Sequence, residues 1–151
     1  MTVSIRLAQP SDAPAIAEVL LASRAAFLPY APSPHSDDSV RGFVRVRLLP
    51  SQKVTVAVMG STVIGVIAVR HDGKATWITQ LYLHPAHVGR GVGTLLLGLA
   101  LAEEKHPIRL YTFQANTGAR RFYERNGFVP IAFGDGAANE EHCPDVLYEC
   151  A

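Results

Sequence analysis

Residues 75–113 contain a strand, a glycine-rich turn, a strongly apolar helix and a second strand, and this order restricts the fold more than any other feature of the sequence. The first strand is predicted over 75–83, the helix over 91–105 and the second strand over 108–113. A strand–helix–strand crossover is right-handed, with its two strands parallel. The helix carries leucines on more than one face, so we expect it to be buried against a sheet.

The rest of the chain supplies further strands and helices around this unit. A first strand is predicted over 3–8, two strands over 53–70 around the turn Gly60–Ser61, and two last strands on either side of a loop over 134–145. Helices are predicted over 12–26 with Ser11 or Asp12 as N-cap, from Asp37, Asp38 or Ser39 to Pro50, and over 116–126 with Asn116 as N-cap. The order βααβββαβαββ predicts a mixed α/β sheet, and 151 residues suit a single domain, 1–151.

Three glycines, Gly89, Gly91 and Gly93, lie between the strand and the apolar helix. The first N–H groups of a helix have no partner within it, and they favour an anion together with the helix dipole. Glycines allow backbone to approach a phosphate without a clash at Cβ. The turn is therefore a candidate pyrophosphate site; the alternative is a tight turn with close packing of helix on sheet.

Two common phosphate-binding motifs are excluded. The pattern G-x-x-x-x-G-K-[ST] is absent, which argues against an ordinary nucleoside triphosphatase. The dinucleotide pattern G-x-G-x-x-G fails because Thr94 stands at its third glycine, and 111–113 hold Tyr, Thr and Phe where an acidic residue is expected.

The segment Val88-Gly89-Arg90-Gly91-Val92-Gly93 resembles the cofactor motif Q/R-x-x-G-x-G/A of the GNAT superfamily of N-acetyltransferases. Residues 116–128, NTGARRFYERNGF, resemble the second signature of that family, N-x-x-A-x-x-F-Y-x-x-x-G-F. Both motifs occur in the right order, and the predicted elements fit the family over essentially the whole chain. The resemblance implies a GNAT-like fold and transfer of an acetyl group from acetyl-CoA to a primary amine.

The resemblance also implies where acetyl-CoA binds. The pantetheine arm would pair with the strand backbone like an added strand, and the pyrophosphate would lie on the N–H groups of the glycine-rich turn. The implied residues are Leu81, Tyr82 and Leu83 for the arm; Val88, Gly89, Arg90, Gly91, Val92, Gly93 and Thr94 for the pyrophosphate; and Asn116, Ala119 and Phe122 on the other side of the arm. Val88 replaces the usual Gln or Arg of the motif.

Two residues are candidates for the chemistry. Tyr123 is the expected general acid, because a phenol with a pKa near ~10 stays protonated at pH 7 and can donate to a leaving thiolate. Its alternative is a core tyrosine whose hydroxyl reaches the surface. Gln80 stands where many relatives place a Glu; it cannot accept a proton, so we expect a water positioned by Gln80, with Tyr82 or His84 nearby, to deprotonate the amine. A backbone N–H at Leu81 or Leu83 is the implied oxyanion donor.

The resemblance places the acceptor amine between the loop after the first helix and the last loop. Phe27, Tyr30 and His35 are the candidates on the first loop. Asp135, Glu140 and Glu141 are expected to attract a cationic amine; the alternative is a solvated loop. The acceptor is expected to be a small-molecule or peptide amine, and residues 145–151 are a candidate homodimer surface by analogy alone.

Charge and composition limit the other classes. A formal net charge of +1 without a basic stripe argues against nucleic acid, and no apolar run approaches the length of a membrane span. The two cysteines, Cys143 and Cys150, have no metal-ligand spacing, so we expect free thiols, no metal and, without a signal-peptide pattern, the cytoplasm. Two rival functions stay open: a non-catalytic acyl-CoA-binding sensor, and an acyltransferase that uses another donor such as succinyl-CoA.

Overall fold

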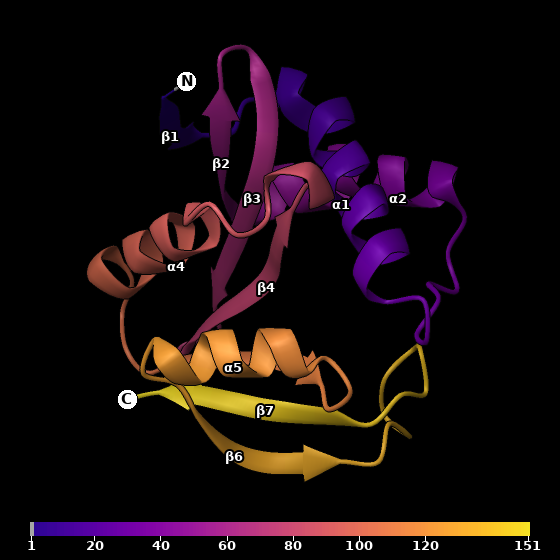
Figure 1. The fold of residues 1–151 in the computed structure, drawn as a ribbon, viewed down its shortest axis with the longest axis vertical. Coiled ribbons are helices and arrows are strands. Elements are labelled where there is room, and N and C mark those ends of the chain that lie inside the picture. Colours follow the sequence, from indigo (N-terminus) through magenta and orange to yellow (C-terminus); the bar gives the residue numbers. More distant parts are fainter. Residues whose placement is uncertain (1) are drawn as a thin grey trace.

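The computed structural model describes residues 2–151, which form a seven-stranded mixed sheet with helices on both faces (Figure 1). The strands are β1 (Val3–Leu7), β2 (Lys53–Met59), β3 (Thr62–His71), β4 (Thr76–Leu83), β5 (Ile108–Phe113), β6 (Val129–Gly134) and β7 (Asp145–Cys150). Their order in the sheet is β1-β2-β3-β4-β5-β7-β6, and β4–β5 is the one parallel pair in the described chain. The predicted mixed α/β sheet and its parallel crossover are confirmed.

The helices follow the predicted order. They are α1 (Ala13–Phe27), α2 (Asp37–Phe43), α3 (Leu49–Ser51), α4 (Val92–Glu103) and α5 (Thr117–Arg125), with short turns η1 (Pro10–Asp12) and η3 (Pro85–His87) and a π-helical segment η2 (Val44–Leu48). The second predicted helix is thus a continuous run of α2, η2 and α3. None of the helices described is both long and apolar enough to cross a membrane.

Three details of the helix boundaries differ from the prediction. Ser36, one residue before the expected candidates, is the N-cap of α2, and its hydroxyl accepts a hydrogen bond from the N–H of Ser39 at 3.1 Å. Asp12 is the N-cap residue of α1, as expected, but its side chain makes no capping hydrogen bond, because its carboxylate instead accepts hydrogen bonds from Arg6 and from the N–H of Gln9. Pro50 lies inside the run, which ends one residue later at Ser51.

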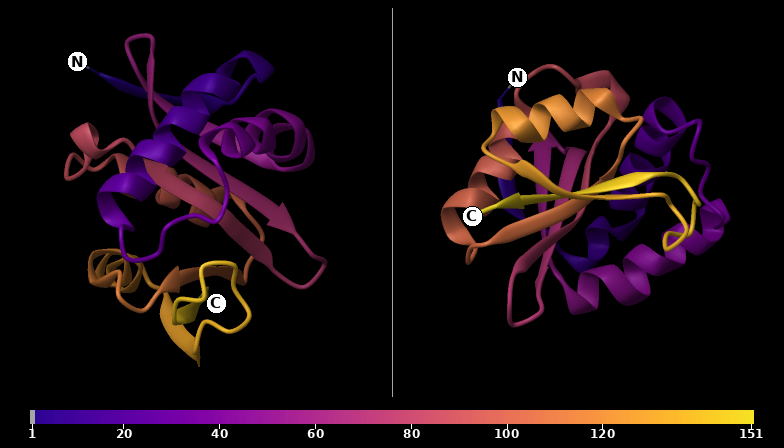
Figure 2. Two further views of the ribbon diagram at one scale, coloured as in Figure 1. Left: turned by 90° about the vertical axis from the view of Figure 1, so that its right-hand side faces the viewer. Right: turned by 90° about the horizontal axis from the view of Figure 1, so that it is seen from below.

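The sheet separates two apolar layers, because alternate residues of a strand point to opposite faces. On β2, Val54, Val56 and Val58 pack against α1 and η2, whereas Ala57 faces α4 and α5. Figure 2 shows α1 and α2 on one side of the sheet and α4 on the other. The strongly apolar α4 is buried along Leu96, Leu97 and Ala100, as its sequence predicted.

The two parallel strands pair only at one end. β4 and β5 are in register at Thr76 with Ile108 and at Trp77 with Arg109, and no pairing continues toward Leu83 and Phe113. Beyond this point β4 pairs with β3 alone, and β5 pairs with β7. The sheet therefore splits between β4 and β5, and one edge of β4 is left without a neighbouring strand.

Candidate functional site

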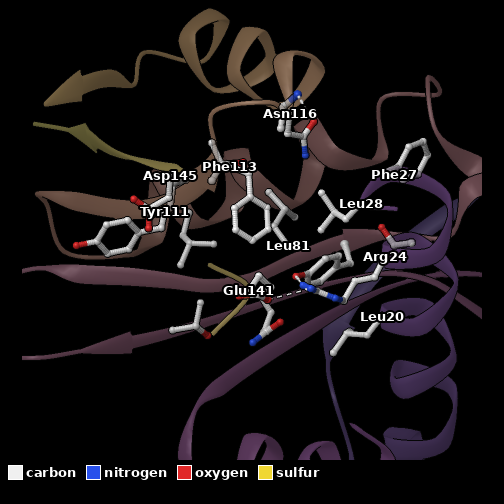
Figure 3. Close-up of a pocket in the computed structure, with 18 of the residues that line it drawn as sticks. Leu20, Arg24, Phe27, Leu28, Leu81, Tyr111, Phe113, Asn116, Glu141 and Asp145 are labelled. Carbon is white, nitrogen blue, oxygen red and sulfur yellow. Dashed lines mark hydrogen bonds and ion pairs between the residues drawn. The ribbon is translucent and has the colours of Figure 1, made fainter. Parts of the chain in front are cut away.

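A large cleft occupies the split between β4 and β5. Its volume is about 1820 Å³, above the ~300–1,000 Å³ usual for a drug-sized ligand, so a long ligand and a second molecule have room together. Residues of α1 and α2 form one side, the start of α4 and the face of α5 that carries Ala119, Phe122 and Tyr123 form the other, and the β6–β7 loop closes one end. Figure 3 shows Leu81 of β4 at the centre, between Phe113, Asn116 and Arg24.

The glycine-rich turn opens into this cleft. Gly89 and Gly91 have φ of 83° and 80°, which a residue with Cβ rarely adopts, and an added Cβ would meet nothing within 4 Å at either position. Gly93 is different, because an added Cβ would lie 3.4 Å from Cζ of Phe122 and 3.5 Å from a methyl carbon of Leu83. The two sequence interpretations thus apply to different glycines: open backbone at the first two, close packing at the third.

The unpaired edge of β4 presents backbone groups to the cleft. The N–H of His84 donates to the carbonyl of Ile64 on β3 at 2.9 Å. Neighbouring residues in a strand direct their N–H groups to opposite edges, so those of Leu83 and Leu81 point to the edge that faces β5. This edge can accept an extended ligand as an additional strand.

Helix α5 holds Tyr123 at the same cleft. Asn116 begins the helix, and its side-chain oxygen accepts a hydrogen bond from the N–H of Ala119 at 3.2 Å, as predicted. Tyr123 lies two turns later, is 9% exposed, and packs against Phe122 and Phe128 with ring centroids 5.4 and 5.8 Å apart. Burial raises the pKa of its phenol well above the usual range, and the nearby Tyr82 adds to the shift, so the hydroxyl stays protonated.

The hydroxyl of Tyr123 has no hydrogen-bond partner among the described residues, although the residue lines the cleft. The contrast is Tyr148, also buried, whose hydroxyl donates to Glu124 at 2.6 Å and accepts from Nε of Arg120 at 3.0 Å. The hydroxyl oxygen of Tyr123 is not fully enclosed by protein, so it can find its partner in the cleft. The position is therefore available to a bound ligand.

The face of β4 that is directed toward α1 carries polar side chains. Tyr82 packs with the α1 layer, and Gln80 is opposite Ala68, which belongs to that layer. Leu81 and Leu83 pack with the α4 layer instead. A register shift at Thr79 separates Gln80 from Ile78 in the pairing with β3. Gln80 and Tyr82 thus face the side of the cleft that α1 and α2 border.

An ion pair links α1 to the β6–β7 loop at this side of the cleft. Nη2 of Arg24 donates to Oε2 of Glu141 at 2.9 Å, and their side chains are 19% and 16% exposed (Figure 3). Arg24 also donates to the carbonyl of Ala31 at 3.2 Å and to the hydroxyl of Tyr82 at 3.4 Å. The charge of Glu141 is therefore matched by a neighbouring guanidinium.

The family model for a GNAT acetyltransferase domain matches residues 50–130, which is more than half of the chain. The chain belongs to the GNAT acetyltransferase family. No curated protein matches the chain at a significant level.

Three solved structures share the fold over nearly the whole chain. The PaiA N-acetyltransferase from Thermoplasma acidophilum, solved in complex with coenzyme A, has a TM-score of 0.80 and 22% identity, over 99% of this chain and 98% of that one. The apo form of YjaB from Escherichia coli has a TM-score of 0.77 and 21% identity, over 100% and 99%. Ard1 from Thermoplasma volcanium has a TM-score of 0.75 and 18% identity, over 99% and 97%. At these identities the likeness shows the fold.

Most residues expected from the GNAT motifs lie on the one cleft. They are Gln80, Leu81, Tyr82, Leu83, Val88, Gly89, Gly91, Gly93, Thr94, Asn116, Ala119, Phe122 and Tyr123, with His35, Glu140 and Glu141 from the two loops and Phe27, which was expected on a loop but is the last residue of α1. Four others do not line it: Arg90 is exposed, Val92 is buried in the α4 layer, Asp135 accepts a hydrogen bond from the N–H of Ala137, and Tyr30 packs edge-on against Phe113 with ring centroids 6.4 Å apart. His84 also lies outside, since its Nδ1 accepts from the N–H of Ala86.

The motif comparison missed several cleft residues of this GNAT domain. Arg24, Tyr111, Phe113 and Asp145 line the cleft, and Figure 3 shows Asp145 beside Tyr111. Arg24 carried a signal in the sequence, because it follows Leu20 by four residues and precedes Phe27 by three on the apolar stripe of α1. Among residues 2–151, no three His, Cys, Asp or Glu side chains gather as a metal site.

Proposed function

We propose that this GNAT domain transfers an acetyl group from acetyl-CoA to a primary amine by direct attack, with Tyr123 as the general acid. The observation that carries the proposal is the position of Tyr123. Its protonated, unpartnered hydroxyl borders the cleft that also receives the glycine-rich turn and the open edge of β4. A site for a CoA thioester and a proton donor for its sulfur therefore share one cavity.

The residues present fit coenzyme A. The open backbone at Gly89 and Gly91, followed by the free N–H groups at the start of α4, suits a pyrophosphate. The unpaired N–H groups of Leu81 and Leu83 suit the amides of a pantetheine arm, and one of them suits the thioester oxygen as it gains charge. The complex of PaiA with coenzyme A supports this assignment on a shared fold.

The reaction needs three proton and charge movements. The nitrogen of a neutral amine forms a bond to the thioester carbon, the C–S bond breaks, and its electron pair goes to the sulfur. Tyr123 hydrogen-bonds to the developing thiolate and supplies its proton, while the amine loses a proton to water. The phenol is a weak acid in a dry site, but the same surroundings also raise the pKa of the thiol above its usual ~8.5.

Gln80 is proposed to position that water. Its amide cannot take a proton, and it lies on the face of β4 that looks toward α1 and the proposed acceptor side. Tyr82 lies two residues along on the same face, with its hydroxyl held by Arg24. Deprotonation through water is consistent with an active site that lacks a carboxylate at this strand position.

The decisive experiment measures thiol release from acetyl-CoA against a broad panel of primary amines, with products identified by mass spectrometry. Amine-dependent release with an acetylated product supports the proposal, and it also names the acceptor class. Succinyl-CoA in competition with acetyl-CoA identifies the preferred donor. Saturable acetyl-CoA binding with no release from any amine contradicts the transferase proposal.

A second candidate function, a non-catalytic acyl-CoA sensor, is favoured by one observation. Gln80 stands where many relatives carry a Glu, so this position has no proton acceptor, and a sensor does not need one. The wild type and Gln80→Glu together separate the two candidates: amine-dependent turnover by the wild type supports the transferase, whereas turnover that appears only in Gln80→Glu supports a sensor that lacks this one side chain.

A further inference from the structure

Two loops distant in the sequence meet at the acceptor end of the cleft. The segment 28–36 follows α1, the segment 135–144 joins β6 to β7, and Figure 1 shows them approaching each other beside α1. Two side-chain contacts join these parts of the chain: the ion pair of Arg24 with Glu141 at 2.9 Å, and a hydrogen bond between Nε2 of His35 and Oε2 of Glu140 at 2.8 Å. The cleft is therefore bridged at this end.

The two bridges differ in burial. The side chains of Arg24 and Glu141 are 19% and 16% exposed, whereas those of His35 and Glu140 are 53% and 67% exposed. An exposed pair contributes little because water screens it, and a partly buried pair is screened much less. The Arg24–Glu141 pair is thus the bridge that can hold the two segments together.

The guanidinium of Arg24 donates hydrogen bonds to three different segments of the chain. It donates to Glu141 on the β6–β7 loop, to the carbonyl of Ala31 after α1, and to the hydroxyl of Tyr82 on β4. Loss of the pair would leave Glu141 charged and poorly solvated, so the ion pair stabilises the bridged position of the loop. The same contact cancels the negative charge expected to attract a cationic acceptor.

We propose that the Arg24–Glu141 bridge makes this chain selective for small amines over amines presented by a polypeptide. This inference rests on the proposed transferase function. A small amine can be enclosed beneath the bridge. A polypeptide needs a path for the chain on at least one side of its reacting amine, at ~3.3–3.6 Å per residue, and the bridged segments occupy that path. Arg24 is a specificity-determining residue in this scheme, acting through the position of the β6–β7 loop.

The test compares two acceptor pools at equal total amine concentration with saturating acetyl-CoA: a mixture of small primary amines, and a random peptide library with free α-amines and lysines. The readout is the ratio of acetylated peptide to acetylated small amine. Glu141→Ala opens the bridge, and Arg24→Ala/Glu141→Ala opens it without leaving an unpaired charge. Glu18→Ala is the matched control, because it removes the exposed 3.2 Å pair of Glu18 with Arg41, which joins α1 to α2 outside the cleft.

The wild type and Glu18→Ala are expected to acetylate small amines with little peptide product. Both bridge variants should raise the ratio at least tenfold, with the KM for acetyl-CoA unchanged, and with faster hydrogen exchange in 28–36 and 135–144. Efficient acetylation of peptides by the wild type would overturn the selectivity alone. An unchanged ratio or unchanged exchange in both bridge variants would also overturn it. Transfer by the wild type to neither pool would overturn the proposed function itself.

Discussion

The carbonyl of Gly91 accepts the first hydrogen bond of α4, from the N–H of Leu95 at 3.0 Å. The N–H groups of Val92, Gly93 and Thr94 precede that bond and have no acceptor within the helix. Gly91 reaches this geometry at a φ of 80°. The donors proposed to hold the pyrophosphate thus depend on one backbone conformation that glycine adopts easily.

Gly91→Ala is expected to weaken acetyl-CoA binding by about tenfold and to lower stability by about 1–2 kcal/mol, because Cβ disfavours the left-handed conformation. The matched control is Gly98→Ala in the middle of the same helix, where an added Cβ meets nothing within 4 Å. The control should stabilise the helix by about 0.5–1 kcal/mol and leave binding unchanged. Titration calorimetry with acetyl-CoA and thermal unfolding measure both effects. Equal affinities in the two variants would contradict the assignment of the turn to the binding site.

Tyr123→Phe should reduce kcat at least tenfold with little change in the KM for acetyl-CoA. The ring packs against Phe122 and Phe128, and a phenylalanine keeps these contacts, whereas the hydroxyl has no partner among the described residues. Steady-state kinetics and unfolding of the same preparation separate catalysis from folding. Tyr148→Phe is the control, because it removes a buried hydroxyl bonded to Glu124 and Arg120 and should affect stability more than turnover. Wild-type turnover in Tyr123→Phe would exclude the residue from the reaction.

Gln80→Ala should lower kcat several-fold without altering the acetyl-CoA affinity, because it removes the amide proposed to position water. Gln80→Glu should instead add a titrating group to the cleft, so that kcat/KM for the amine gains a dependence on the ionisation of that carboxyl. Rate–pH profiles of the three proteins check both outcomes. Identical rates and profiles in the wild type and in Gln80→Ala would refute the water-positioning role.

The sequence predicted the helices and strands well, because each of them is determined by residues that are close together in the chain. The apolar surface of α4 and the Asn116 cap each follow from neighbouring residues. The N-cap of α2 was misplaced because Ser36, Asp37, Asp38 and Ser39 are all good caps, and only the backbone geometry selects Ser36.

The acceptor side was predicted less completely because its contacts span the chain. Glu141 was expected to attract a cationic amine, yet it is paired with Arg24, which lies 117 positions away on α1. Tyr30 was assigned to the acceptor, yet it packs on Phe113, which no local pattern relates to it. The motif residues follow from a local signature, whereas these pairings follow from how β6 and β7 return to the sheet beside α1.

The carboxylate of Asp12 makes stability depend on pH at the acid end. It accepts two hydrogen bonds from Arg6, at 2.7 and 3.0 Å, and one from the N–H of Gln9 at 2.7 Å. The bonds from Arg6 are the main cause that holds the pKa of Asp12 below its usual value in the folded state, and they join β1 to the start of α1. A carboxyl whose folded pKa is depressed stabilises fully above its unfolded pKa of ~3.9, and this stabilisation is lost as the pH falls through the folded pKa.

Asp12→Asn should therefore lower the free energy of unfolding by about 1–2 kcal/mol at pH 7, as expected for loss of charge-assisted hydrogen bonds. The difference from the wild type should shrink as the pH falls below ~4, because the carboxyl of the unfolded wild type is then protonated, while that of the folded protein takes up its proton only at lower pH. Urea unfolding at pH 7 and pH 3 measures this difference in the free energy of unfolding. Asp38→Asn is the matched control: its side chain is 95% exposed beside Arg41, so it should change stability by less than about 0.5 kcal/mol at either pH. A deficit in Asp12→Asn that stays constant down to pH 3 would contradict the role of its charge.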